Sequence, residues 1–145
     1  MINGVIAFLW VKLCYKNKET IMEFNELYEI AKSKATRWQL ANHAFVGKVG
    51  AAILTDKGNV YTGRDIDVPC SLGFCAEHAA ISAMLNAGES CIVKLVAVSA
   101  KHGVFSPCGR CREFMYQINK ENIKCEIMLK DKIVTLDELL PERWK

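Results

Sequence analysis

The stretch LGFCAEH at residues 72–78, read with SPCGRCR at residues 106–112, decides how this chain is interpreted. The three thiols of Cys75, Cys108 and Cys111 form a soft donor set that suits Zn²⁺. Three protein ligands leave the fourth tetrahedral position open for water, as in catalytic rather than structural zinc sites. Glu77 follows the first thiol by two residues, so its carboxylate can lie beside that water without binding the metal. The two motifs therefore predict a hydrolytic zinc centre.

Length and composition indicate one globular domain. The chain has 145 residues, 51% of them hydrophobic, which is enough for a core and too apolar for a disordered chain. Its net charge of +3 is small, and lysine and arginine are scattered along the sequence. We therefore expect no nucleic-acid partner, because such a partner requires a basic stripe or patch.

The cysteine content favours a reducing compartment. Seven cysteines are an odd number, and their spacing does not suggest a disulfide framework. Outside the two motifs lie Cys14, Cys70, Cys91 and Cys125, of which the last two lie in or beside apolar runs and are expected to be small buried hydrophobes. This usage predicts a cytoplasmic protein.

Residues 1–21 differ from the rest of the chain. Residues 5–11 are apolar, but this run ends at Lys12, is too short to span a bilayer and is not typical of a signal peptide. We therefore expect no membrane association. Met22 opens a segment that resembles a domain start, so residues 1–21 are interpreted as an appendage or an upstream start. A packed or interfacial helix is the alternative. Residues 22–145 are predicted to form a single domain.

Hydrophobic periodicity predicts alternating helices and strands. The expected elements are a helix over 24–34 capped by Asn25, a hairpin of strands 49–55 and 60–63 around Gly58, a helix over 76–86 closed by Gly88, a strand over 92–99, a helix over 112–119, strands 125–129 and 133–135, and a helical turn over 136–140. This order indicates a layered α/β fold with a central sheet. Both motifs then fall at helix N-termini, whose N–H groups and partial positive charge stabilise thiolates.

With these motifs the chain resembles the cytidine deaminases, small homo-oligomeric nucleoside enzymes that have the blasticidin-S deaminases as near cousins. The resemblance runs from about Val49 to Trp144 and rests on residues 49–52, 72–77, 106–112 and 139–144. It implies a three-layer α/β/α fold with a mixed central sheet, one Zn²⁺ per subunit, and usually a homotetramer with shared active sites. It also implies conversion of cytidine or deoxycytidine to the uracil nucleoside with release of ammonia, a reaction of pyrimidine salvage.

The resemblance also implies roles for individual residues. The three cysteines would be the zinc ligands, and Glu77 would take a proton from water and deliver it to the pyrimidine ring and then to departing ammonia. The backbone N–H of Ala76 and carbonyl groups near Ser106 would hold the base. Trp144 would either reach the pocket of a neighbouring subunit or pack on its own subunit.

The chain departs from the family pattern in two places. Asp65 and Asp67 stand where the family usually has Asn and Glu for the ribose. They can accept hydrogen bonds from sugar hydroxyls and would repel a 5′-phosphate, which makes a modified or antibiotic-type cytosine nucleoside an alternative substrate. They can equally be turn residues. His78 stands where an arginine is usual, and we expect it to donate a hydrogen bond to a cysteine sulfur and to be partly protonated near neutral pH.

Other interpretations of the cysteines and histidines remain open. Cys70 can complete a closed site of four cysteines, which would make the chain a non-catalytic zinc-stabilised module. The pair Cys108 and Cys111 alone is also typical of a redox motif at a helix start. His43 and His102 are either additional ligands or surface residues in polar loops.

Overall fold

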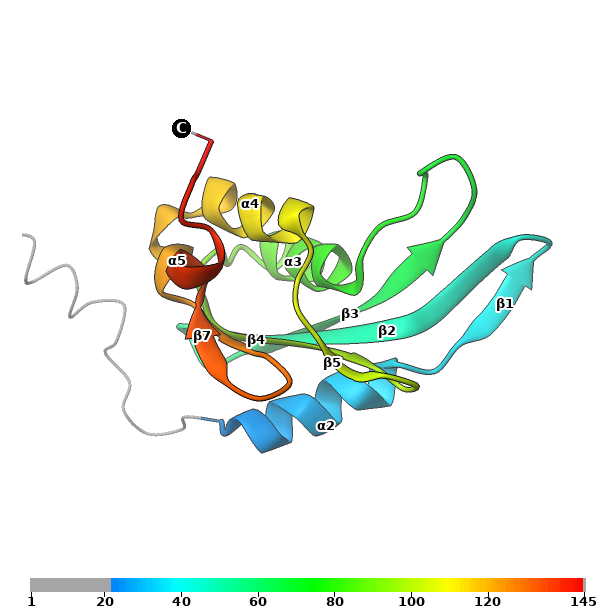
Figure 1. Cartoon of the computed structure of the whole chain (residues 1–145), viewed down its shortest axis with the longest axis horizontal. Helices are drawn as coiled ribbons and strands as arrows, with labels where there is room; N and C mark the ends of the chain where they lie inside the picture. The colour runs from blue at the N-terminus through cyan, green and yellow to red at the C-terminus, as the bar shows by residue number, and fades with distance from the viewer. Residues whose placement is uncertain (1–21, 145) are drawn as a thin grey trace, which may run out of the picture.

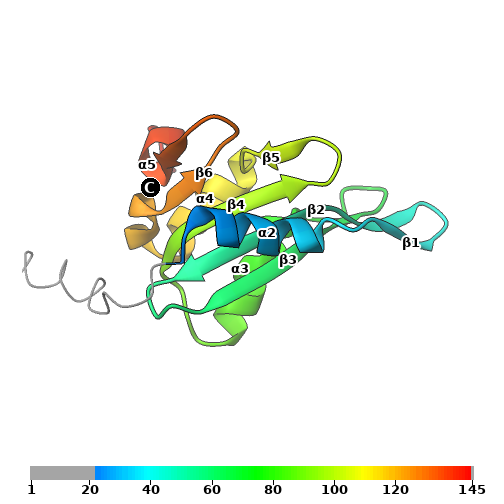
Figure 2. The same cartoon turned by 90° about the horizontal axis from the view of Figure 1, so that it is seen from below.

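The computed structural model describes residues 22–144 and places one mixed β-sheet between two layers of helices (Figures 1 and 2). The elements are α2 (Phe24–Lys34), β1 (Trp38–Ala41), β2 (Ala44–Thr55), β3 (Val60–Asp67), α3 (Ala76–Asn86), β4 (Ile92–Ser99), β5 (Gly103–Phe105), α4 (Gly109–Ile118), the short 3₁₀-helix η1 (Lys120–Lys124), β6 (Glu126–Met128), β7 (Ile133–Thr135) and α5 (Leu136–Leu139). Helix α2 covers one face of the sheet, and α3 and α4 cover the other. The predicted three-layer α/β/α fold is confirmed. The interpretation of residues 1–21 lies outside the described residues.

Strand β2 organises the sheet. Strand β3 pairs antiparallel with one edge of β2, while β1 and β4 pair antiparallel with successive parts of the other edge. Strand β4 then pairs with β5 antiparallel and with β6 parallel, and β7 closes this side by pairing with β6. The parallel pair makes the sheet mixed. Between residues 22 and 144, no helix is long and apolar enough to cross a membrane.

Most predicted elements are confirmed, and the differences are informative. Helix α2 has the predicted bounds, but its cap was wrong: the N-cap is Glu23, without a side-chain hydrogen bond, rather than Asn25. Strands β2 and β3 extend beyond the predicted hairpin, and α4 begins at Gly109 rather than at Arg112. The polar connection through His43 is the turn of a further hairpin, in which His43 takes a φ of 63°.

Two hydrophobic clusters lie on the two faces of the sheet. One joins the sheet to α3 and α4 and contains Ile81, Leu95 and Met115; the other joins it to α2 and contains Leu27 and Val96. Since side chains alternate along a strand, neighbouring residues of β4 serve different clusters. The sheet is thereby fixed on both faces, and α3 and α4 are held side by side above it.

Asn122 is a buried polar residue that connects three elements. It is completely buried, accepts the N–H of Ile92 at 2.7 Å and donates to the carbonyls of Ser90 and Met115 at 3.0 and 2.9 Å. It thus satisfies backbone groups of the α3–β4 loop, β4 and α4 with one side chain.

We expect Asn122→Leu to lower the free energy of unfolding by about 2 kcal/mol or more, because the buried N–H of Ile92 and the buried carbonyl of Met115 each lose a partner at about 1–3 kcal/mol, and the half-buried carbonyl of Ser90 loses one as well. Leucine is similar in size, so loss of hydrogen bonding rather than of volume dominates. Urea unfolding followed by circular dichroism measures the change. Gln117→Leu, on the exposed side of α4, is the matched control and should stay within about 0.5 kcal/mol of the parent. Equal stability of the two variants would contradict this prediction.

Candidate functional site

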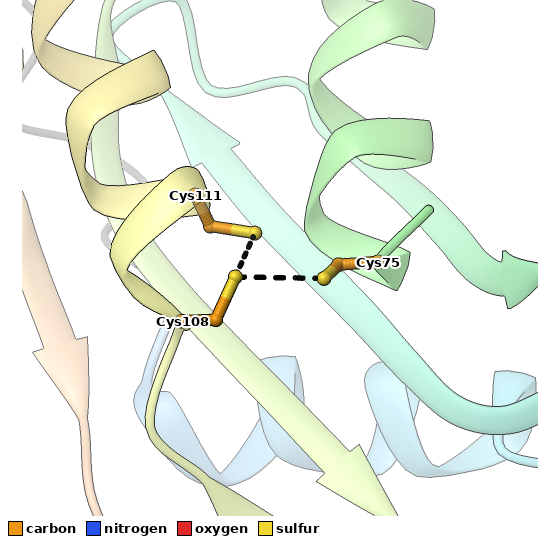
Figure 3. Close-up of side chains that lie close together, drawn as sticks. All are labelled: Cys75, Cys108 and Cys111. Atoms are coloured by element: carbon orange, nitrogen blue, oxygen red, sulfur yellow. Dashed lines mark hydrogen bonds between the residues drawn. The ribbon is translucent and has the colours of Figure 1, made fainter. Parts of the chain in front are cut away.

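Three cysteine side chains from two helices converge at one point of the structure. Cys75 is the N-cap of α3, Cys108 is the N-cap of α4, and Cys111 lies in the first turn of α4. Figure 3 shows the three side chains pointing toward one another. The Sγ atom of Cys108 lies 3.6 Å from that of Cys75 and 3.5 Å from that of Cys111. Thiolates bound tetrahedrally at about 2.3 Å from one Zn²⁺ would be about 3.8 Å apart, so the cluster fits one ion.

Close packing between α3 and β3 positions the first of these thiols. Gly63 of β3 lies against the first turns of α3: a Cβ atom there would be 2.2 Å from the carbonyl oxygen of Ala76 and 2.4 Å from the nitrogen of Ala80. Only glycine permits this approach. The start of α3 therefore lies directly on the sheet, and Cys75, its N-cap, is placed opposite the start of α4.

The protonation chemistry of the thiols favours a cation between them. Burial raises the pKa of Cys75 to about 11, and burial also raises the pKa of Cys111, with the Glu77 carboxylate adding to both shifts. Burial acts the same way on Cys108, but hydrogen bonds from the backbone and thiol of Cys111 outweigh it and lower the pKa of Cys108. Two of the three thiols would thus remain protonated on their own, and a divalent cation would displace their protons.

Glu77 is a buried carboxylate beside the cluster. It is only 5% exposed and lies in the first turn of α3. Burial raises its pKa above the usual glutamate value, and the nearby Asp65 carboxylate adds to this shift. Between residues 22 and 144, the group of side chains whose ligand atoms lie close enough together to hold a metal ion contains the three cysteines and not Glu77. A carboxyl group whose pKa is shifted toward neutrality can both accept and return a proton.

His78 contacts the cluster from the side of α3. Its Nδ1 lies 3.4 Å from the Sγ atom of Cys111, and its ring stacks on Phe114 at 4.6 Å between centroids. Burial lowers the pKa of His78, and the charge of Arg110 lowers it further. The neutral imidazole is therefore the main form near pH 7. These surroundings do not favour the partial protonation that was expected from the sequence. What His78 can offer the sulfur is a hydrogen bond.

Asp65 and Asp67 are strand residues, so their interpretation as turn residues was wrong. Both belong to β3, and both contact β2: Asp65 Oδ1 accepts the N–H of Val49 at 2.8 Å, and Asp67 forms an ion pair with Lys48. The lysine offsets the charge of Asp67. Repulsion of a 5′-phosphate would be weaker than the two aspartates alone imply. Sequence reasoning missed Lys48, because a β-bulge in β2 sets its register to β3.

The remaining expected residues separate into those inside and those outside the site. Ala76 is completely buried at the start of α3 beside Cys75, whereas Trp144 is 64% exposed near the C-terminus. Cys70, His43 and His102 are exposed and lie outside the group of described side chains that could hold a metal ion. That group therefore has three sulfur donors rather than four. The described side chains therefore do not form the closed four-cysteine site.

Known proteins are similar to this chain in sequence and in fold. The family model for the cytidine and deoxycytidylate deaminase zinc-binding region matches residues 22–127. The cytidine deaminase of Mycobacterium tuberculosis is 33% identical over 97 residues, which cover 66% of this chain and 71% of that protein. Its crystal structure matches with a TM-score of 0.73 and 29% identity over 86% of this chain and 99% of that one. The structure of cytidine deaminase from Burkholderia pseudomallei matches with a TM-score of 0.68 and 28% identity over 85% of this chain and all of that one. The chain belongs to the family of zinc-dependent cytidine and deoxycytidylate deaminases.

Proposed function

We propose that this protein is a hydrolase that converts cytidine and deoxycytidine to uridine and deoxyuridine and releases ammonia. The observation that carries the proposal is the cluster of three cysteine sulfurs with the buried carboxylate of Glu77 beside it. The relatives described as cytidine deaminases support the same reaction. The protein would then act in pyrimidine salvage.

The chain's own residues would divide the work as follows. Cys75, Cys108 and Cys111 would hold one zinc ion, which when bound supplies a Lewis acid that activates water for attack on C4 of the pyrimidine. Glu77 would accept the first proton of that water and pass it to the ring nitrogen, and it would then carry the second proton, from the hydroxyl group added at C4, to the leaving amine. Its burial excludes bulk water as a competing proton carrier. Ala76 lies in the first turn of α3, where backbone N–H groups have no acceptor within the helix. Its N–H can therefore donate a hydrogen bond to the carbonyl of the base.

The sugar would lie toward β3. We propose that Asp65 and Asp67 accept hydrogen bonds from its hydroxyl groups, since Asp65 lies close enough to Glu77 to shift its pKa. Both carboxylates are also engaged by β2. A modified or antibiotic-type cytosine nucleoside is the second candidate substrate, because aspartates so engaged offer a sugar fewer acceptor positions than a free pair would.

The protein is further proposed to be a homo-oligomer, with a tetramer expected from the family resemblance. Exposed large apolar side chains support an association surface, among them Leu72 at 77% and Trp144 at 64% exposure. Trp144 would contact the pocket of another copy. Residues 22–145 would form the single catalytic domain, and residues 1–21 an appendage. A cytoplasmic location is proposed because the odd number of cysteines and their spacing do not suggest a disulfide framework.

A substrate panel tests the proposed reaction. Zinc-replete protein is mixed with cytidine, deoxycytidine, cytosine, deoxycytidine monophosphate and a modified cytosine nucleoside, and absorbance and ammonia are followed. Turnover of the two plain nucleosides is expected. Cys108→Ser should lose both zinc and turnover, whereas Cys70→Ser, a matched change at an exposed cysteine outside the cluster, should lose neither. Turnover of the modified nucleoside alone would favour the second candidate. Silence on the whole panel with one zinc bound would refute the deaminase proposal.

A further prediction concerns His78. Removing its contact with Cys111 in His78→Ala is expected to weaken zinc binding by about tenfold, because groups that hydrogen-bond to metal ligands typically contribute 10–100-fold to affinity or activity. Competition with a chromogenic zinc chelator measures the change. His78→Arg keeps a donor at this position and should retain most of the affinity. His102→Ala, at an exposed histidine, is the control. Unchanged zinc affinity in His78→Ala would exclude this role.

A further inference from the structure

Arg112 makes contacts that the proposed chemistry does not use. It follows Cys111 directly, and its guanidinium reaches three acceptors on two separate segments. Its Nε donates to the carbonyl of Pro107 at 2.7 Å, and Nη2 donates to the hydroxyl of Ser106 at 3.0 Å. Its Nη1 donates to the carbonyl of Leu139 at 3.2 Å. One side chain thus joins the loop before α4 to the end of α5.

The loop that Arg112 holds leads directly to the metal cluster. Ser106 and Pro107 immediately precede Cys108, whose Sγ atom contacts the other two sulfurs. The position of this loop therefore sets both the sulfur of Cys108 and the carbonyl groups proposed to hold the base. A planar guanidinium with several fixed N–H directions can hold two neighbouring acceptors of this loop at once. An ammonium group lacks that geometry.

The third contact extends the connection to the C-terminal segment. The carbonyl of Leu139 lies in the last turn of α5, where carbonyls have no intrahelical partner. Beyond it, Arg143 forms an ion pair with Asp137 and lies 5.5 Å from the ring centroid of Tyr116 on α4. The C-terminal segment is thus tied to α4 twice, once through Arg112 and once through Arg143. Any contact that this segment makes with substrate depends on the same connection.

We infer that Arg112 is a positioning residue that fixes residues 106–108 for substrate binding and zinc retention and couples them to α5. The claim about substrate binding rests on the proposed function. The claim about zinc retention rests on the described contacts alone. Arg112 touches neither the sulfurs nor Glu77 in any described hydrogen bond, so it acts through the loop. Its loss should consequently affect KM and zinc retention more than kcat.

The test compares the full chain with Arg112→Ala and Arg112→Lys, using cytidine as substrate. Arg112→Ala is expected to raise KM about tenfold and to speed zinc release to a chromogenic chelator about tenfold, with a smaller change in kcat. Arg112→Lys keeps the charge and the stem but cannot reproduce three directed bonds, so it should shift both quantities in the same direction. Arg37→Ala, at an exposed arginine stacked on Phe45 of β2, is the matched control and should leave both unchanged.

The two readouts separate this inference from a purely structural role and from the proposed function. A lower melting temperature with unchanged KM and unchanged zinc release would overturn the inference. Full recovery of both quantities in Arg112→Lys would also overturn it, because charge rather than directed hydrogen bonding would then suffice. If the parent protein turns over no cytidine, the proposed function fails, whereas zinc release still decides the role of Arg112 in holding the loop.

Discussion

Replacing Glu77 by glutamine is expected to lower kcat by about 10²–10⁴-fold while zinc content and fold stay unchanged. Glutamine has nearly the same shape but cannot accept and return a proton. It also removes a carboxylate whose charge raises the pKa of Cys75 and Cys111, so the metal site loses a repulsive neighbour rather than a support. Stability without zinc should therefore be equal to or higher than that of the parent.

Steady-state kinetics, zinc analysis and thermal unfolding of Glu77→Gln together test this prediction. Glu26→Gln is the matched control, since Glu26 also lies in the first turn of a helix but is exposed on α2, on the opposite face of the sheet. Its kcat should equal that of the parent. If Glu77→Gln kept kcat within tenfold of the parent with one zinc bound, another group would have to move the proton, and the role proposed for Glu77 would be wrong.

The part of the site that was predictable from sequence is local in the chain. Cys108 and Cys111 are three residues apart and Glu77 is two residues from Cys75, so short spacings place each motif on one helix start. The apolar periodicity of α2, α3 and β4 is similarly local, and these elements have the expected bounds. Only the convergence of the two motifs in space depends on the fold, and the family resemblance predicted that fold.

What sequence reasoning missed depends on contacts between distant residues. Strand β1 was missed because it is only four residues long and all four are exposed, so no buried apolar face marks it. The start of α2 was predicted at Phe24, but its cap was wrong because Phe24 packs into the core and Lys94 of β4 donates to the carbonyl of Met22, so tertiary contacts rather than a cap define this end. The contact of Arg112 with a carbonyl 27 residues away has no sequence signal at all.

The contact between Gly63 and α3 gives the second large effect. We expect Gly63→Ala to lower kcat/KM by about 10²-fold and the free energy of unfolding by about 1–3 kcal/mol. The new Cβ would lie 2.2 and 2.4 Å from backbone atoms of Ala76 and Ala80, which no side-chain rotation can move away. Helix α3 would have to shift by about 1 Å, a displacement large enough to misplace reacting groups. Cys75 and Glu77 would move with it, so zinc should also be released faster.

Gly109→Ala is the matched control for this change. Gly109 is the first residue of α4 and lies between Cys108 and Cys111 in the sequence. A Cβ atom there would meet no atom within 4 Å. The same chemical change beside the same cluster should therefore leave zinc retention and kcat/KM near those of the parent, and alanine should favour the helix slightly. If both variants lost activity equally, the added methyl group itself would be harmful near the site. If neither did, the approach of α3 to β3 would not be what positions Cys75 and Glu77. A loss confined to Gly63→Ala would show that a glycine in the sheet, twelve residues before the first thiol, determines where the zinc site forms.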